Sequence, residues 1–299
     1  MADVTFDGLL RRHANDCALL IGNGINRHGG PRTNSWDRLL LEIARDCAIN
    51  LRSVPPGTAL TEFYDILELK STARTTTLQA EFCALMKHWR AQAHHRRIMG
   101  WARRHDVPVL TTNFDEVLSA AADARFLRPR QETFTDFYPW ECRFAHQLHP
   151  SPCGGFGIWH INGMARYRRS IRLGLSHYMG SVHRARGWLH RGSGSLFDGK
   201  NRVNWEGKAS WMHLVFNKPL VIFGLALEEN EVFLRWLLIE RARYFSKFPD
   251  RSHPAWYVYP HKPDDDREPG KLFFLEGIGV RPVRVASYDA IYDAGAWGH

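Results

Sequence analysis

The sequence lacks any stretch that approaches the roughly 18 consecutive apolar residues of a membrane-spanning helix. Acidic and basic side chains appear within residues 1–17, before any long apolar run, so this segment does not resemble a secretory signal. Low-complexity segments and internal repeats are also missing. These absences argue against membrane-bound, secreted and repeat-built proteins. We expect a folded protein of the cytoplasm with no membrane partner.

Cysteine is scarce and widely spaced, with five residues in the whole chain and no CxxC pair. The odd number and the spacing argue against a disulfide framework and against a zinc site of two CxxC pairs. We therefore expect reduced, structural thiols and no bound metal. The five are Cys17, Cys47, Cys83, Cys142 and Cys153.

Negative charge is in deficit, because 40 Lys and Arg residues face 31 Asp and Glu residues. The excess of positive charge concentrates at 87–97, 101–105 and 164–172. Such stretches could attract phosphates or nucleic acid, but they are more often solvated helix faces or arginine stems packed on tryptophan. Charge alone leaves both interpretations open, and any contact with nucleic acid is expected to be indirect.

The 299 residues, of which 44% are hydrophobic, are enough for one large core. Apolar runs alternate with segments of helical periodicity, which predicts an α/β fold with a doubly wound, mostly parallel sheet. We expect a single domain over 1–299, with a helical insertion at about 55–105. The region 178–215 is interpreted as a lid, an interface or covering structure. Strands are expected at 17–21, 107–111, 157–161, 171–175, 220–223, 255–259 and 280–285, and helices at 35–49, 59–70, 76–90, 93–104, 229–245 and 269–276.

Four sets of residues directly follow expected strands, where ligands bind in sheets of this kind. The first is the glycine turn Gly22, Asn23, Gly24, Ile25 and Asn26, and the second runs from Thr111 through Thr112 and Asn113 to Asp115. The third is His160 with Gly163, and the fourth is Gly224, Leu225 and Ala226. Each has a structural alternative: a ligand-free turn, a helix cap, a satisfied core histidine, or an ordinary strand-to-helix turn.

Taken in order, these sets resemble the sirtuin superfamily, whose usual pattern is GAGxS, T-x-N-x-D, a histidine followed by glycine, and a late glycine turn. Here the corresponding segments are GNGIN (22–26), TTNFD (111–115), HING (160–163) and GLA (224–226). The chain lacks the zinc ribbon of classical sirtuins, and in this it resembles the bacterial sirtuin-like branch. This absence argues against protein deacylation. Asn26 stands where the family has serine.

The resemblance implies a Rossmann-like domain that takes NAD as substrate and cleaves it to nicotinamide and ADP-ribose. It implies that Asn113 orients the ribose and the attacking water, that His160 acts as base, and that Asp115 holds the carboxamide or the local network. Arg27 and Arg32 are candidates for binding the pyrophosphate of NAD.

In that branch the activity is commonly the toxic arm of antiphage defence. We expect no appended sensor domain, so control is expected from a homo-oligomer or a separate partner such as a helicase-like ATPase. The alternative is a non-catalytic regulatory subunit that binds NAD or ADP-ribose.

Overall fold

The computed structural model describes residues 5–31, 33–71, 76–129, 138–200, 203–228, 231–263 and 265–298. Within them, an eight-stranded sheet has the order β3-β4-β5-β2-β1-β6-β7-β8. The run from β5 to β8 is parallel, whereas β3 and β4 form an antiparallel edge. The strands are β1 (Ala18–Ile21), β2 (Val109–Thr111), β3 (Arg125–Leu127), β4 (Arg143–Ala145), β5 (Ile158–His160), β6 (Leu220–Phe223), β7 (Ala255–Pro260) and β8 (Val280–Val285).

The parallel strands have the order of a doubly wound sheet. Counted along the chain, the six parallel strands are arranged 3-2-1-4-5-6, which is the Rossmann order. The predicted fold class is therefore confirmed. The strand order reverses between β1 and β6, and ligands of such sheets bind beyond the carboxyl ends at that point.

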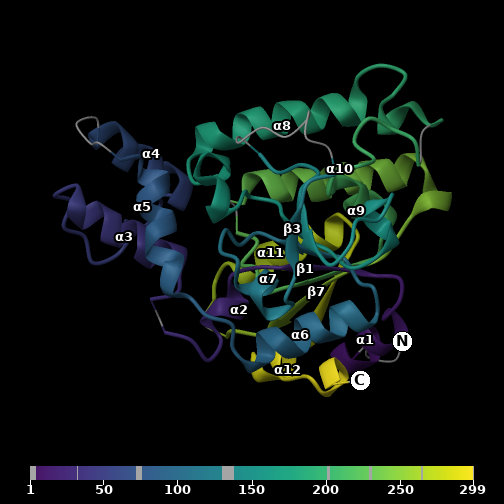
Figure 1. Ribbon diagram of the computed structural model, residues 1–299, viewed down its shortest axis with the longest axis horizontal. Coiled ribbons are helices and arrows are strands. Elements are labelled where there is room, and N and C mark those ends of the chain that lie inside the picture. Colours follow the sequence, from purple (N-terminus) through teal and green to yellow (C-terminus); the bar gives the residue numbers. More distant parts are fainter. Residues whose placement is uncertain are drawn as a thin grey trace.

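The sheet is covered on both faces by helices (Figure 1). In β1, Leu19 and Ile21 face one core while Ala18 and Leu20 face the other, because successive side chains of a strand point to opposite sides. The first core includes α1 (Phe6–Arg12), α6 (Ala93–Arg104) and α12 (Asp289–Tyr292). The second includes α8 (Leu175–His190), α9 (Met212–Asn217), α10 (Val232–Lys247) and α11 (Glu268–Gly277).

A helical unit extends to the left of the sheet in Figure 1. It consists of α3 (Trp36–Asp46), α4 (Leu60–Lys70) and α5 (Leu78–Leu85), followed by the 3₁₀ turn Met86–His88. These helices share a core of their own, whereas α6 packs against the sheet. The unit thus begins earlier than the predicted residue 55, and it ends before α6 rather than at 105.

The region 178–215 covers one face of the sheet. Tyr178, Ala185 and Leu189 of α8 are buried in the second core, together with Trp205 and Trp211. The described part of this region therefore contributes to the core of the domain.

The predicted strand at 171–175 is wrong. Ile171 and Leu173 are buried, which explains the apolar pattern, but they join the core of the helical unit as irregular chain. The backbone N–H of Arg172 donates to the carbonyl of Asn162 at 2.8 Å, and Leu175 already begins α8. This segment is therefore held against the turn after β5 and pairs with no strand of the described chain.

The other differences concern short or weakly patterned elements. The edge strands β3 and β4 have three residues each, too few to show a period of two. Helix α8 contains Gly180 and Gly187, which lower its helix propensity, and the sequence pattern did not predict this helix. Helix α10 is described from Val232, and the predicted start at 229 lies outside the described residues.

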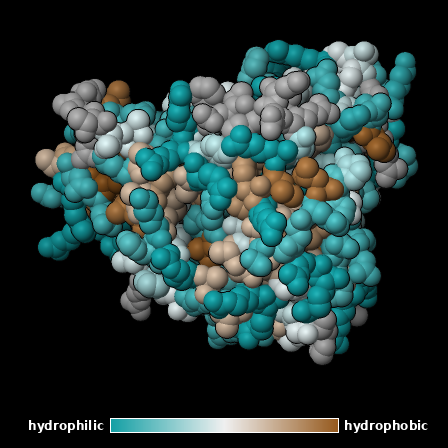
Figure 2. Space-filling model, in the orientation of Figure 1, coloured by the Kyte–Doolittle hydropathy of each residue, from teal (hydrophilic) through white to brown (hydrophobic). Residues whose placement is uncertain are grey.

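The surface in Figure 2 is mostly hydrophilic, with apolar side chains gathered at the helical unit and in the middle of the face, below α8. Among the described helices, none combines the length and the hydropathy needed to cross a bilayer.

Candidate functional site

The predicted site residues converge at one edge of the sheet. Ile21 of β1 is paired in register with Thr111 of β2 and with Phe223 of β6, and Thr111 is paired with His160 of β5. Because these strands are parallel, the segments that follow them all emerge at the carboxyl edge. The four predicted sets, far apart in sequence, are thus brought together.

Asn113 and His160 contact each other directly, and we call them the buried pair. The Nδ1 atom of His160 lies 2.7 Å from the backbone carbonyl oxygen of Asn113. A carbonyl only accepts hydrogen bonds, so Nδ1 must carry the proton and the neutral ring presents a lone pair at Nε2. This contact fixes both the tautomer and the orientation of the imidazole.

The buried pair carries polar atoms without partners. In the described part of the chain, His160 Nε2 and both polar atoms of the Asn113 side chain are buried and make no hydrogen bond. The same holds for Thr112 Oγ1 and Asn162 Nδ2, which belong to the same two turns. Leaving a buried polar group unpaired costs about 1–3 kcal/mol, so such a cluster is typical of a site that binds something.

Burial determines the charge of His160. The side chain is fully buried, and desolvation lowers its pKa below the usual value. The hydrogen bond to Asn113 acts in the opposite direction but is the smaller effect. The ring of Phe144 meets the imidazole edge-on at 5.5 Å between centroids. The imidazole is therefore neutral at neutral pH and can accept a proton at Nε2.

Asp115 lies in a hydrogen-bond network rather than facing an open space. Its Oδ2 accepts from Asn26 Nδ2 at 2.8 Å, and its Oδ1 accepts from the backbone N–H of Val117 at 3.0 Å. Burial raises the pKa of this carboxyl to about 6, although both hydrogen bonds oppose the shift. Asp115 thus joins the turn after β2 to α2 (Gly24–Arg27) and supports the local network.

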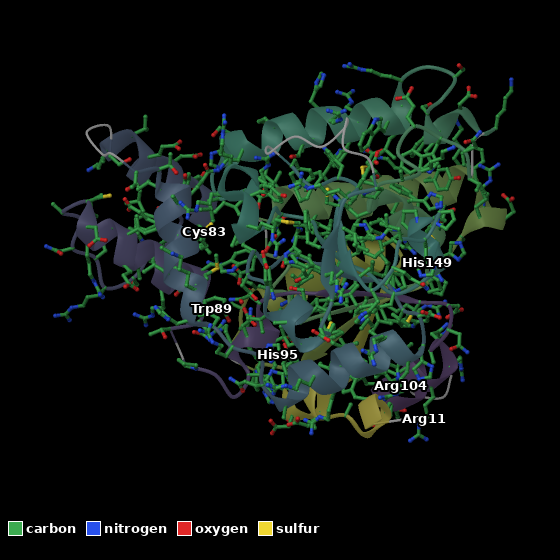
Figure 3. All side chains as sticks on the ribbon, viewed as in Figure 1. Arg11, Cys83, Trp89, His95, Arg104 and His149 are labelled. Carbon is green, nitrogen blue, oxygen red and sulfur yellow. The ribbon has the colours of Figure 1, made fainter. Side chains whose placement is uncertain are left out.

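His95 of α6 completes this network, at the place where α6 meets α2 (Figure 3). Its Nδ1 accepts from the backbone N–H of Gln92 at 3.2 Å, so Nε2 carries the proton and donates to Asn26 Oδ1 at 3.1 Å. Burial lowers the pKa of His95 to about 3, which keeps the ring neutral. Asn26 also donates to Asn23 Oδ1 at 2.9 Å. Its side chain is fully engaged within the protein.

The predicted glycines serve close packing of the backbone. A Cβ on Gly22 would lie 2.4 Å from the carbonyl oxygen of Gly224, and one on Gly24 would lie 2.5 Å from the Tyr292 hydroxyl. Gly163 has a φ of +95°, and its Cβ would lie 2.1 Å from the carbonyl oxygen of Ser170. Packing against neighbouring chain therefore explains why these positions are glycine.

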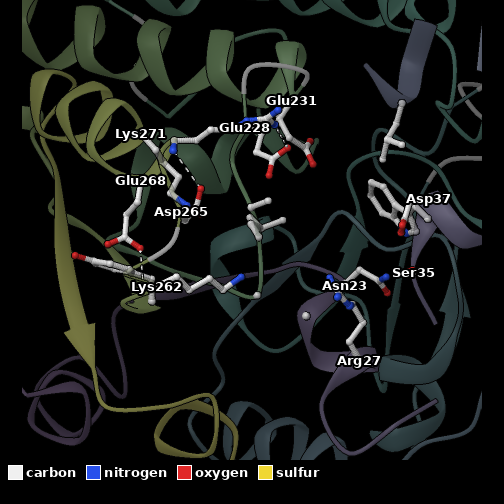
Figure 4. Close-up of a pocket in the computed structure, with 18 of the residues that line it drawn as sticks. Asn23, Arg27, Ser35, Asp37, Glu228, Glu231, Lys262, Asp265, Glu268 and Lys271 are labelled. Atoms are coloured by element: carbon white, nitrogen blue, oxygen red, sulfur yellow. Dashed lines mark hydrogen bonds and ion pairs between the residues drawn. The ribbon is translucent and has the colours of Figure 1, made fainter. Parts of the chain in front are cut away.

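A cavity of about 510 Å³ opens at the point where the strand order reverses (Figure 4). Its size lies within the usual range for small-molecule sites. Its walls include the turn after β1, the turn after β6 and the end of β7. Of the predicted binding residues it contains Asn23, Gly24, Arg27, Thr112, Gly224, Leu225 and Ala226.

The buried pair does not line this cavity. Thr112 faces the cavity, Asn113 touches His160, and Phe114 packs into the core of the helical unit. Trp36, at the start of α3, lines the cavity and stacks on Phe114 with ring centroids 4.9 Å apart. Three consecutive residues therefore connect the cavity, the buried pair and the helical unit.

Several predicted residues do not contact the cavity. Gly22, Asn26 and Gly163 are held in internal packing, and the carbonyl of Ile25 is bound to His94 Nε2 at 2.8 Å. Arg32 lies outside the described residues. Sequence reasoning missed Trp36, which lies in the helix expected at 35–49 but was not expected at the site, and it missed the acidic and basic side chains around the end of β7.

One group of side chains has the spacing of metal ligands. The candidate ligand atoms of His28, Asp289 and Asp293 lie within 4.8 Å of one another. Arg97 forms an ion pair with Asp293, so a cationic side chain already compensates this carboxylate. None of these three residues lines the cavity, so the group is not part of the candidate site.

Strand order and cavity position define an α/β protein of the doubly wound, Rossmann-like class, with a polar site at the switch point. No protein-family model matches the chain, and no curated protein matches its sequence.

Proposed function

We propose that this protein hydrolyses the N-glycosidic bond of NAD, releasing nicotinamide and ADP-ribose. The observation that carries the proposal is the contact between Asn113 and His160. It leaves an acceptor nitrogen and a side-chain amide without partners in two touching residues at the carboxyl edge of the sheet. The resemblance of the four turns to sirtuins supports NAD as the substrate.

The chemistry needs a positioned water and a base. The bond between ribose C1′ and the pyridinium nitrogen breaks, its electrons neutralise the pyridinium, and nicotinamide leaves uncharged. Water oxygen bonds to C1′ and loses one proton to His160 Nε2, which later returns it to solvent. A neutral imidazole held in one tautomer is suited to this transfer. The Asn113 amide, free on both polar atoms, would orient the ribose or the water.

This arrangement must open before NAD can react, because the buried pair is sealed from the cavity. We propose that Trp36, which lines the cavity and stacks on Phe114 next to Asn113, moves in this opening. A closed resting state is suited to a toxic activity that depletes NAD. We therefore propose a restrained effector of antiphage defence, released by self-association or by a separate activating partner.

Nicotinamide release from NAD tests the proposal. The expected result is release by the wild type, enhanced when the site is opened, and at least about a hundredfold less release by His160→Gln and by Asn113→Leu. His183→Gln, which changes an exposed histidine of α8, is the matched control and should behave as wild type. Equal release by all four proteins would contradict the assignment of the buried pair.

A non-catalytic subunit that binds NAD or ADP-ribose is the second candidate. The complete burial of Asn113 and His160, outside the cavity lining, favours it. Binding of NAD without nicotinamide release, even by a variant that opens the site, would establish this alternative.

A further inference from the structure

Three cationic side chains around the cavity form no ion pair with any carboxylate of the described residues. Arg267 is compensated by Glu228, whose carboxylate lies 3.4 Å from the guanidinium. Arg27, Lys262 and Lys271 also line the cavity. Among the described residues, no carboxylate oxygen lies within 4.0 Å, the limit for an ion pair, of their charged nitrogen atoms. Positive charge is thus available inside a concave site.

Lys262 and Arg27 approach the cavity from opposite sides (Figure 4). Lys262 follows the end of β7, and its side chain extends across the cavity towards the side where Asn23 and Arg27 lie. Its ammonium nitrogen lies 5.7 Å from the centre of the Tyr288 ring, a contact that leaves its hydrogens available to a ligand.

The nearby carboxylate of Glu268 does not neutralise Lys262. Its Oε1 lies 2.5 Å from His261 Nδ1, and its Oε2 accepts from the backbone N–H of Lys262 at 3.2 Å. Both oxygens are therefore occupied by other groups. The Lys262 side chain extends away from them (Figure 4).

The two cations restrict the chemistry of the ligand. A cationic group on each side, with the glycine backbone of Gly24 and Gly224 also in the lining, matches a group with two adjacent negative charges. Asp37, Glu231 and Asp265 line the same cavity and form no ion pair among the described residues, so hydroxyl groups are preferred beside them over further phosphates. A diphosphate attached to a sugar satisfies both requirements.

We propose that Lys262 and Arg27 hold the diphosphate of a nucleoside diphosphate in this cavity while the buried pair stays closed. The choice of ADP-ribose as the complete ligand that contains this nucleoside diphosphate rests on the proposed function. Because the cavity is open in the sealed structure, binding of this part of the ligand precedes opening. Lys262 is thus a binding residue that none of the four sequence sets contains.

Isothermal titration calorimetry with ADP-ribose, ADP and adenosine tests this assignment. Wild type should bind ADP-ribose and ADP at least about tenfold more tightly than adenosine, the factor expected from one charged hydrogen bond. Lys262→Met and Arg27→Met should each weaken the binding of ADP by about tenfold and leave the affinity for adenosine unchanged. Lys208→Met, an exposed lysine outside the cavity lining, is the control and should bind as wild type.

Three outcomes would overturn the proposal: no binding of ADP by wild type, unchanged ADP affinity in Lys262→Met, or equal losses in Lys262→Met and Lys208→Met. The readout is independent of hydrolysis. ADP binding that depends on Lys262 without any nicotinamide release would contradict only the proposed function. Nicotinamide release with Lys262-independent ADP binding would contradict only this inference.

Discussion

The imidazole Nδ1 of His160 donates a hydrogen bond to the backbone carbonyl of Asn113 at 2.7 Å, joining the ends of two neighbouring parallel strands. This bond orients the ring, and within the described residues Nε2 and the Asn113 amide have no hydrogen-bond partner. The same arrangement that we propose for catalysis therefore costs folding free energy, which makes the site testable by stability as well as by activity.

Replacing Asn113 by leucine should stabilise the protein while abolishing nicotinamide release. Leucine has nearly the same shape and removes two buried polar atoms that lack partners, which is worth about 1–3 kcal/mol. Urea denaturation measures the free energy of unfolding. Asn217→Leu is the control, because Asn217 donates to the carbonyl of His213 at 3.0 Å and its loss should destabilise. A less stable Asn113→Leu protein would show that this amide is satisfied in the folded state.

Trp36→Ala should increase nicotinamide release. Loss of the stacking on Phe114 weakens the closed state, and an aromatic pair of this kind contributes about 0.5–1.5 kcal/mol, up to roughly a tenfold change in population. Trp89→Ala is the matched control, because Trp89 packs at the edge of the same helical core but does not line the cavity. Equal rates in the two variants would exclude Trp36 as part of the barrier.

Asp115 should make stability depend on pH. Its pKa is raised from 3.8 to about 6, so between these values the folded state binds more protons than the unfolded state. The free energy of unfolding therefore falls as pH rises through this window, by roughly 3 kcal/mol in total. Asp115→Asn should remove that part of the slope. Chemical denaturation at pH 4 and at pH 7 gives the comparison, and identical slopes would show that Asp115 titrates normally.

Gly163→Ala should destabilise the fold by at least about 3 kcal/mol. The residue has a φ of +95°, and an added methyl group would lie 2.1 Å from the Ser170 carbonyl oxygen. Gly180→Ala is the control, because a methyl group there meets nothing within 4 Å and alanine favours helix α8 by about 0.5–1 kcal/mol. If Gly163→Ala folds as stably as wild type but binds no ligand, the glycine serves binding rather than packing.

The sequence predicted the sheet well because its central strands are fully buried. Short apolar runs such as those of β1 and β6 are distinct when both faces of the strand are covered. The same rule failed at 171–175, since burial of Ile171 and Leu173 arises from the helical unit rather than from a sheet. A run of apolar residues predicts that the segment is buried. Which element it packs against is decided by the tertiary structure.

The site was predicted in part for a similar reason. Residues directly after parallel strands meet at one edge, so Thr112, Asn113 and His160 could be grouped from their positions alone. Whether each faces a cavity, a neighbour or a core depends on side-chain direction, which spacing does not encode. Lys262 follows β7 in the same way and could have been found by applying that rule to the later strands.

The most direct test compares nicotinamide release from NAD by Trp36→Ala with that by the double variant Trp36→Ala/His160→Gln. In this opened background the account predicts release by the first protein and at least about a hundredfold less by the second, because glutamine cannot take the proton. Equal release by both proteins would contradict the central claim that His160, oriented by Asn113, is the base.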